Sequence, residues 1–482
     1  MREGCAGPSL AEADELNARV KSRGTEAAGK DLLAELRPIF HPRAVALIGA
    51  SSGHGKVGRM FMERFLEAGF ERLYPVNPRE REIFGVATYP SVGDVPEPID
   101  LALILAPPRA VSGAVRECAA CGVKGIVVIT GSVGDGGREE VREIVEIARE
   151  AGSRIIGPNC LGIYCPASRL PFPMRPSMES GSVGVISQSG SFADLLTLMA
   201  SRNGVRFSKA VSCGNESDLS AVDFLEYLGE DPETQVIVAY LEGIAEGRRF
   251  YRLARAISKS KPTLVWKCGA TTAGSKAAAS HTGALSGSRQ IWEAVQRGAG
   301  IIAVRSLEET LDCLYALHFQ PLPRGRRIAI ATGPGGPAVG AVDACVELGL
   351  EIAPLSSGTK RRLTKVIPGS GTSVENPVDL SIAAIVAPRM YAEVVEILGR
   401  DENVDMILVI GTGGEEFSNE VREVAGGIGK PLAVSLINPM PSLLRDYEIL
   451  MGSRVPVYPD PTRAAVALAK LAEYARFRER CA

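Results

Sequence analysis

The chain has 482 residues, 45% of them hydrophobic, and a formal net charge of −2, so about two to four globular domains are expected rather than a disordered protein. Its Lys and Arg residues are scattered and form no basic stripe, which argues against nucleic acid as a partner. No apolar run approaches the roughly 18 residues of a membrane helix and the polar N-terminus lacks the centre of a secretory signal, so we expect a cytoplasmic protein without membrane contact.

Short β-branched runs alternate with amphipathic segments from about Ala44 onwards, as they do in parallel α/β sheets. Residues 1–34 precede this pattern and are interpreted as an N-terminal extension. Within residues 35–166 we expect strands at 44–50, 72–77, 101–108, 124–130 and 153–159. Helical segments, such as those at 58–69 and 138–152, lie between them. The pattern predicts a complete doubly wound, Rossmann-like domain.

Two proline-rich breaks divide the rest of the chain. The stretch at 166–176 is followed by predicted strands at 182–188, 236–243 and 262–269. The stretch at 320–324 is followed by predicted strands at 326–333, 406–414 and 431–437. The sequence therefore predicts three α/β domains, at 35–166, 167–322 and 323–482.

Each predicted domain opens with a strand, a glycine-rich turn and a helix, at 48–58, 186–196 and 331–341. Such turns direct backbone N–H groups and a helix N-terminus outward, where phosphate or carboxylate can bind. The alternative is that glycine merely permits a tight turn between strand and helix.

The first turn contains Gly53-His-Gly55-Lys-Val-Gly58, which formally matches the dinucleotide pattern GxGxxG. In a dinucleotide domain an acidic residue about 20 positions further on holds the ribose. The second strand here ends in Tyr74-Pro-Val-Asn77-Pro, without Asp or Glu. An NAD-dependent oxidoreductase is therefore disfavoured, and another ligand that carries phosphate is expected.

Ten cysteines are too sparse for a disulfide framework. The CxxC formed by Cys118 and Cys121 lies in a predicted helix with no second pair nearby. We interpret these cysteines as packing residues and expect no metal site.

Four loops in the first domain, with the sequences VALIGASS…KVG, YPVNP, LILAPP and VVITGS, follow successive predicted strands. They resemble the CoA-binding domain of the succinyl-CoA synthetase superfamily, in particular the α subunit of ADP-forming acetyl-CoA synthetases. The resemblance implies a CoA site made by Gly49, Ser51, Ser52, Lys56, Val57, Gly58, Val76, Asn77, Pro78, Ala106, Pro107, Pro108, Thr130 and Gly131.

Of the four histidines, only His281 lies in a long run of small and hydroxylated residues, at 269–288. This run predicts a mobile loop that presents one nucleophile, and imidazole suits reversible phosphoryl transfer. The alternative is a flexible linker with an incidental histidine. For His41 and His318 we expect a surface or partly buried ring, and His54 lies in the predicted CoA loop.

The segment SHTGAL around His281 resembles the phosphohistidine segment of the ADP-forming acyl-CoA synthetases. The resemblance implies that Glu242, at a predicted strand end, orients the catalytic imidazole. It also implies a phosphate site made by Gln188, Ser189, Gly190, Ser191 and Asn159. The last domain resembles the same family through residues 333–351 and 376–380.

The resemblance implies a fold in which a CoA-binding Rossmann-like domain precedes two flavodoxin-like domains of the succinyl-CoA synthetase type. It implies the α subunit of an ADP-forming acid–CoA ligase that uses CoA, phosphate and a small carboxylic acid. ATP or ADP and Mg²⁺ are then expected on a separate ATP-grasp β subunit, in an α2β2 assembly. Arg175 could meet a second negative charge on the acid, or be a surface arginine. A non-catalytic, CoA-binding paralogue is the alternative function.

Overall fold

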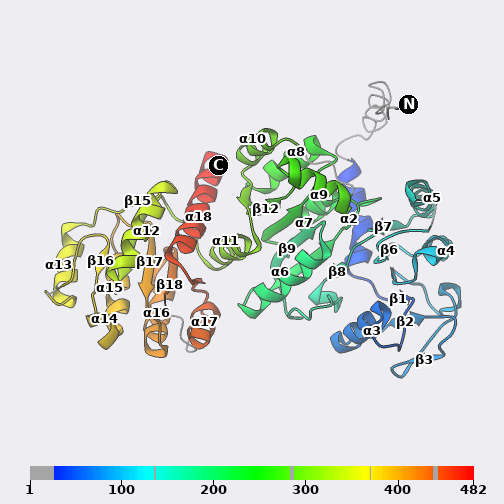
Figure 1. Cartoon of the computed structure of the whole chain (residues 1–482), viewed down its shortest axis with the longest axis horizontal. Coiled ribbons are helices and arrows are strands. Elements are labelled where there is room, and N and C mark those ends of the chain that lie inside the picture. The colour runs from blue at the N-terminus through cyan, green and yellow to red at the C-terminus, as the bar shows by residue number, and fades with distance from the viewer. Residues whose placement is uncertain (1–26, 135–136, 283–286, 370, 438–442, 482) are drawn as a thin grey trace, which may run out of the picture.

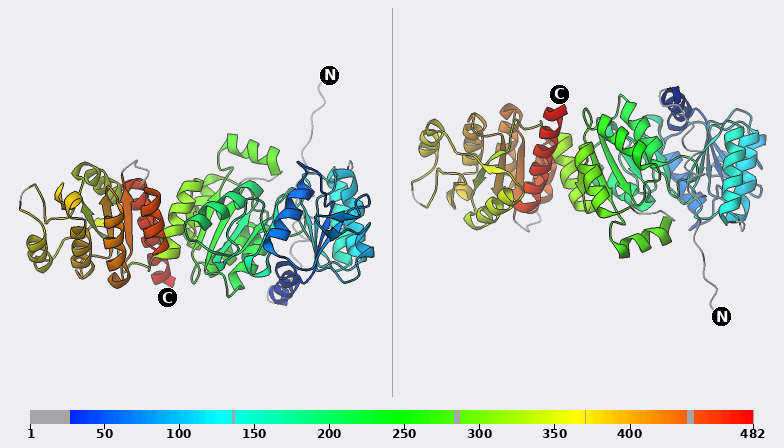
Figure 2. Two further views of the ribbon diagram at one scale, coloured as in Figure 1. Left: turned by 90° about the horizontal axis from the view of Figure 1, so that it is seen from below. Right: turned by 90° about the horizontal axis from the view of Figure 1, so that it is seen from above.

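Three α/β units lie in a row along the long axis of the molecule (Figure 1, Figure 2). Each unit is a sheet with the helices that cover it, and is called a layer below. The computed structural model describes residues 27–134, 137–282, 287–369, 371–437 and 443–481. Each layer is built on its own sheet, as the alternating sequence pattern predicts. The predicted three-domain α/β architecture is therefore confirmed.

The first sheet is entirely parallel and has the order β2-β1-β5-β6-β7. Its central strands are fully buried because helices cover both faces, which explains their continuous apolar sequence. The strands are β1 (Val45–Ile48), β2 (Leu73–Val76), β5 (Leu101–Ile104), β6 (Gly125–Val128) and β7 (Arg154–Ile156), with a short hairpin of β3 (Glu82–Ile83) and β4 (Val86–Ala87). The helices are α2 (Ala27–Phe40), α3 (Val57–Ala68), η1 (Val92–Asp94), α4 (Pro108–Ala120) and α5 (Gly137–Glu150).

The second sheet has the order β13-β12-β11-β9-β10-β8, and only β8 runs antiparallel to its neighbour. The strands are β8 (Gly162–Tyr164), β9 (Ser180–Ser187), β10 (Phe207–Ser212), β11 (Val236–Leu241), β12 (Thr263–Lys267) and β13 (Ile302–Val304). The helices are η2 (Pro166–Ser168), α6 (Gly190–Arg202), α7 (Ala221–Glu230), α8 (Gly247–Ile257), α9 (Thr272–Thr282), α10 (Arg289–Ala299) and α11 (Leu307–Phe319).

Helix α9 corrects one prediction. Residues 272–282 were expected in a loop because they lack large apolar side chains, but they form a helix. Alanine has the highest intrinsic helix propensity and lysine a high one, so the segment can be helical without an apolar face.

The third sheet has the order β15-β14-β17-β18-β19, with β16 also paired to β14. The strands are β14 (Arg327–Thr332), β15 (Glu351–Ile352), β16 (Val378–Asp379), β17 (Met406–Gly411), β18 (Leu432–Leu436) and β19 (Val457–Tyr458). The helices are α12 (Gly335–Glu347), α13 (Ser357–Val366), α14 (Ala383–Val386), α15 (Arg389–Gly399), α16 (Glu415–Ile428), α17 (Leu443–Gly452) and α18 (Pro461–Cys481).

Apolar cores join neighbouring layers. One core contains residues of the first and second sheets, and another contains residues of the second and third. Phe40 of α2 stacks on Tyr227 of α7, with ring centroids 4.6 Å apart, and α18 packs against both α11 and α12. The proposed boundaries at 35–166, 167–322 and 323–482 stay a prediction. Helix α2 begins at Ala27, before the first boundary, and β8 pairs within the second sheet although it precedes the second boundary.

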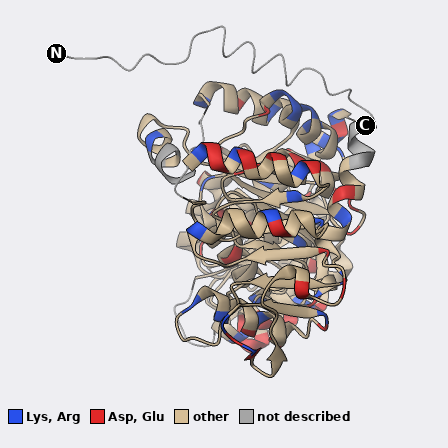
Figure 3. Cartoon of the chain, turned by 90° about the vertical axis from the view of Figure 1, so that its right-hand side faces the viewer, with Lys and Arg blue, Asp and Glu red and all other residues tan. Residues whose placement is uncertain are grey.

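Charges of both signs are interspersed along the helices on the side of the molecule drawn in Figure 3. In the described part of the chain, no helix combines the length and apolarity that crossing a bilayer requires.

Candidate functional site

The loops predicted to bind CoA meet at the carboxyl edge of the first sheet and are bonded to one another. Asn77, after β2, donates from Nδ2 to the carbonyl of Ala50, after β1 (2.8 Å). Thr130, after β6, donates from Oγ1 to the carbonyl of Ala106, after β5 (2.7 Å). A doubly wound sheet places its ligand at this edge. The geometry brings the predicted loops together.

Gly58 allows α3 to lie directly on the first strand end. A Cβ on Gly58 would lie 2.1 Å from the carbonyl oxygen of Gly49, and one on Gly49 would lie 2.9 Å from the backbone nitrogen of Ala106. Both distances are too short for any side chain. The glycines at these two positions therefore serve close packing of the loop on the sheet.

The helices α3 and α4 point their N-termini to the same edge. Their N-cap residues, Lys56 and Pro107, make no side-chain capping bond. The first N–H groups of a helix have no partner within the helix and carry partial positive charge. Two further residues predicted to bind CoA, Val57 and Pro108, are the first residues of α3 and α4. Of the others, Val76 and Ala106 are buried, whereas Pro78 and Gly131 are exposed.

Glu80 is a loop residue that sequence reasoning missed. Its carboxylate accepts hydrogen bonds from the Ser51 hydroxyl (3.0 Å) and the Ser52 backbone N–H (3.1 Å). The segment 74–78 contains no acidic residue, but the chain turns back after Asn77 and returns Glu80 to the glycine loop.

The predicted phosphate turn lies at the end of β9. Ser189 is the N-cap of α6, and its hydroxyl accepts from the backbone N–H of Phe192 (3.4 Å). The Oγ atoms of Ser189 and Ser191 are 3.2 Å apart. Gly190 begins α6, and a Cβ there would lie 2.7 Å from Cγ of Leu161. Two hydroxyls and a helix N-terminus thus face the same place, which suits an anion.

The side-chain amide of Gln188 makes its hydrogen bonds within the protein. The residue is buried, and its Oε1 accepts from the backbone N–H groups of Glu242 and Gly243. Its Nε2 donates to the carbonyl of Gly243 (2.9 Å). The amide holds the strand end that carries Glu242 rather than presenting free donors to a ligand.

Glu242 follows β11 directly and is 4% exposed. The Tyr240 hydroxyl lies 3.5 Å from its Oε1, and Lys267 donates from Nζ to its backbone carbonyl (2.7 Å). Burial lowers the pKa of Lys267. The backbone of His281 belongs to α9, but its side chain lies outside the described residues. The predicted contact between Glu242 and His281 therefore stays a prediction.

Glu216 is a second residue that no sequence motif indicated. Its carboxylate accepts from the backbone N–H of Ala221, at the start of α7 (2.9 Å). Burial is the main cause that raises its pKa to about 7, while a hydrogen bond with Gln188 opposes the rise. A carboxyl group that changes charge near neutral pH thus contacts the amide that holds Glu242.

Asn159 lies where the first two layers meet. It has a φ of 61°, its backbone N–H donates to the carbonyl of Thr130 (3.0 Å), and its Nδ2 is 3.4 Å from Oδ1 of Asn215. Asn215 donates in turn from its backbone to the carbonyl of Pro158 (2.9 Å). The predicted CoA loops and the second sheet are joined through this loop pair.

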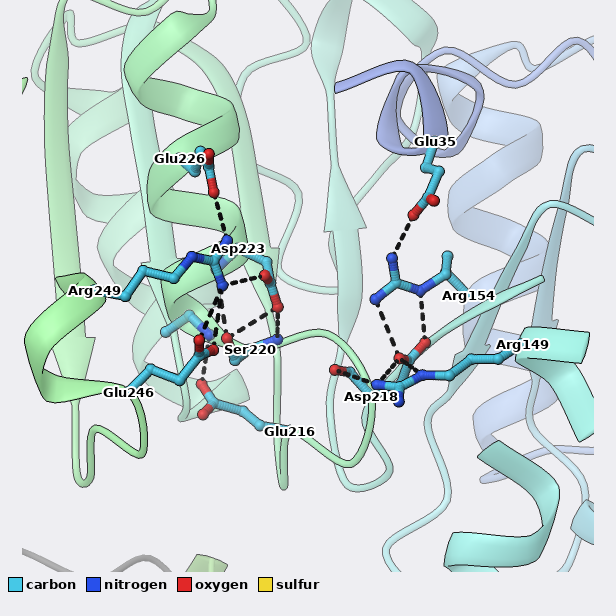
Figure 4. Close-up of polar contacts among 11 residues, drawn as sticks. Glu35, Arg149, Arg154, Glu216, Asp218, Ser220, Asp223, Glu226, Glu246 and Arg249 are labelled. Carbon is cyan, nitrogen blue, oxygen red and sulfur yellow. Dashed lines mark hydrogen bonds and ion pairs between the residues drawn. The ribbon is translucent and has the colours of Figure 1, made fainter. Parts of the chain in front are cut away.

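Asp218 strengthens the contact between the first two layers, which is called the joint below (Figure 4). Its fully buried carboxylate binds the guanidinium groups of Arg149 and Arg154 and accepts from the backbone N–H of Ile155 (2.8 Å). Arg154 also pairs with Glu35 of α2. Elements of the first layer thus converge on one side chain of the second.

Arg175 is engaged by the protein. Its Nη2 and Nε lie 2.7 and 2.9 Å from the two carboxylate oxygens of Glu67 in α3. This bidentate pair is the main cause that lowers the pKa of Glu67. The geometry fits the surface interpretation of Arg175.

The CxxC cysteines are free thiols, as are all cysteines in the described residues. Cys118 is buried in α4, and burial raises its pKa, which suits a packing role, whereas Cys121 is exposed and the packing interpretation does not hold for it.

Comparisons with known proteins agree with this geometry. Residues 43–166, which contain the first sheet, match the family described as "CoA binding domain". Residues 180–317 match "Succinyl-CoA ligase like flavodoxin domain". The chain is 37% identical to the α subunit of acetate–CoA ligase [ADP-forming] II from Pyrococcus furiosus, over 91% of this chain and 97% of that one. The chain belongs to the ADP-forming acetate–CoA ligase family.

Other members of the ADP-forming acetate–CoA ligase family are longer. The chain is 39% identical to acetate–CoA ligase [ADP-forming] I of Archaeoglobus fulgidus and spans 63% of its length. Among solved structures, an acetyl-coenzyme A synthetase 1 of Candidatus Korarchaeum cryptofilum, in complex with phosphate and ADP, has a TM-score of 0.84 at 33% identity. That match covers 92% of this chain and 97% of the other, so it includes the third layer.

Proposed function

We propose that the chain is the CoA-binding, phosphohistidine-carrying α subunit of an ADP-forming acid–CoA ligase. The observation that carries this proposal is the 37% identity to a relative named as an α subunit, almost end to end. The name of that relative supports a partner subunit. We propose that the partner is an ATP-grasp β subunit that binds ATP or ADP with Mg²⁺, in an α2β2 assembly.

In the proposed reaction, phosphate attacks the acyl carbon of an acyl-CoA bound at the first sheet. The acyl–sulfur bond breaks, an acyl–oxygen bond forms, and CoA leaves as the thiol. The Nε2 or Nδ1 atom of His281 then attacks the phosphorus of the acyl phosphate, so that a nitrogen–phosphorus bond forms, the phosphorus–oxygen bond to the acyl group breaks and the carboxylate leaves. His281 transfers the phosphoryl group to ADP on the partner. Every step is reversible.

The positions of the described residues support the roles that we propose for them. The α6 N-terminus with Ser189, Gly190 and Ser191 would hold the phosphate, and Asn159 would contact it at the joint between the layers. Glu242 would orient the His281 ring. Phosphoryl transfer depends mainly on positioning and on fixed donors for negative charge, which a helix N-terminus supplies.

A small carboxylic acid is the proposed substrate class. CoA, ATP and ADP are metabolites of the cell interior, which supports the expected cytoplasmic location.

Phosphorylation of the chain tests the proposal. The chain and an ATP-grasp subunit of this family are incubated with labelled ATP and Mg²⁺, and acid-labile, base-stable phosphate is measured. We expect labelling in the wild type and in His318→Asn, because the His318 ring lies in α11, outside the proposed site. We expect none in His281→Asn. Label that persists in His281→Asn would refute the assignment.

A wild-type chain that binds CoA but takes no label would instead support the non-catalytic alternative.

A further inference from the structure

The carboxylate of Glu80 occupies hydrogen-bond donors in the glycine loop before α3. The Ser51 hydroxyl donates to Oε1, and the Ser52 backbone N–H donates to Oε2. The Asn77 amide lies 3.4 Å from Oε1. Ser51, Ser52 and Asn77 are all residues assigned to the proposed CoA site. The carboxylate of Glu80 is therefore hydrogen-bonded to groups that are assigned to CoA binding.

The surroundings of Glu80 suit an anion. The side chain of Lys56 folds over the loop, so that its Nζ would lie 3.3 Å from a Cβ on Gly53. Hydrogen bonds from Ser52 are the largest cause that lowers the pKa of Glu80, and the charge of Lys56 adds to them. Glu80 is therefore ionised at neutral pH, and its negative charge is stabilised by donors and a cation, groups that also suit a phosphate.

We propose that Glu80 is an internal anion that competes with a phosphate group of CoA for the Ser51–Ser52 loop, so that CoA binds only as Glu80 is displaced. The inference rests on the proposed CoA site. Each N–H or O–H donor serves one acceptor well, and two anions at the same donors repel each other. Glu80 thus weakens CoA binding while its hydrogen bonds order the loop.

An acidic residue after the second strand can also accept from ribose hydroxyls, as in dinucleotide folds. In that case Glu80 would strengthen binding. The existing bonds favour competition, because Ser51 and Ser52 already donate to both carboxylate oxygens, and the ribose of CoA carries a phosphate that a nearby carboxylate repels.

Calorimetric titration of the full chain with three probes distinguishes these roles. The probes are CoA, dephospho-CoA, which lacks the ribose phosphate, and pantetheine, which lacks all phosphates. The variants are Glu80→Gln and Glu80→Ala. Glu82→Ala is the matched control, because Glu82 is exposed in β3 and has no ion pair in the described structure. Thermal unfolding of each variant verifies the fold.

We expect the dissociation constant for CoA to fall about threefold to tenfold in Glu80→Ala and less in Glu80→Gln, which retains a weaker neutral acceptor. Tighter binding of both CoA and dephospho-CoA would identify the diphosphate as the competing group. Tighter binding of CoA alone would identify the ribose phosphate. Pantetheine and the Glu82→Ala control should show no change.

Weaker or unchanged CoA binding in folded Glu80→Ala would overturn the inference and leave the proposed function intact. An equal gain for pantetheine would also overturn it, because no phosphate would be involved. If no variant and no wild-type protein bound CoA, the proposed function itself would fail.

Discussion

Arg154 and Asp218 form a bidentate ion pair across the joint between the first two layers, with Nε–Oδ2 and Nη2–Oδ1 distances of 3.0 and 3.1 Å. The Asp218 side chain is fully buried and the Arg154 side chain is 17% exposed. Removal of one member of a buried pair leaves the other without compensation. The ion pair therefore helps to hold the two layers together.

Asp218→Asn should lower the free energy of unfolding by about 2–4 kcal/mol, because Arg149 and Arg154 lose their shared carboxylate. Denaturant unfolding measures this change. Glu179→Gln, which breaks a pair between the exposed Glu179 and Arg206, is the control and should cost under about 1 kcal/mol. Equal losses in both variants would contradict the proposed importance of the joint.

Gln188→Ala should slow phosphorylation of His281 without changing CoA affinity. The variant removes the amide that binds the backbone on both sides of Glu242, and each buried N–H left unpaired costs about 1–3 kcal/mol. The measurements are the rate of label uptake and the dissociation constant for CoA. Gln235→Ala, at an exposed glutamine, is the control. If Gln188→Ala left the rate of label uptake unchanged, Gln188 would not support the proposed role of Glu242.

Gly58→Ala should destabilise the protein by about 1–3 kcal/mol and weaken CoA binding, since its Cβ would overlap the carbonyl of Gly49 and push α3 off the sheet. Gly113→Ala in α4 is a suitable control, because nothing lies within 4 Å of a Cβ there. That control should be neutral or slightly stabilising, as alanine favours a helix. Thermal unfolding and CoA titration check both variants.

Glu216→Gln should become relatively more stable as the pH rises. The folded pKa of Glu216 is raised from 4.5 to about 7. The folded state therefore binds more protons than the unfolded state between these values, and the wild type loses stability as the pH rises through this window. Glutamine does not titrate.

The stability of Glu216→Gln relative to the wild type should increase by up to about 2 kcal/mol between pH 5 and pH 8. Burial also raises the pKa of Asp194, to about 6, but that contribution is common to both proteins and cancels. A difference that does not vary with pH would show that Glu216 is ionised throughout.

Strands with continuous apolar sequence could be predicted, because burial on both faces requires that pattern. β10 was missed because it contains Lys209, which is 1% exposed. The sequence alone did not show that Asp231 and Glu233 neutralise this lysine. Their carboxylate oxygens lie 3.0 and 2.5 Å from its Nζ. The short edge strands were missed because two or three residues carry too little pattern.

The arrangement of the loops in the candidate site was predictable where backbone geometry determines it. The glycine turns of the first two layers and the strand-end loops lie where a parallel sheet places them. The roles of Glu80, Gln188 and Glu216 depend on contacts between segments distant in the chain, and no local pattern encodes those contacts. Gln188 was expected at the phosphate for its place in the turn, and only its partners show that it holds another strand.

The position of β8 bears on how the protein could be divided. This strand precedes the proline-rich stretch but forms the edge of the second sheet, beside β10. Two fragments separated within residues 166–176 would each carry half of a strand pair: a loose strand on one and an open β10 edge on the other. A cut in this stretch would therefore separate an edge strand from its sheet.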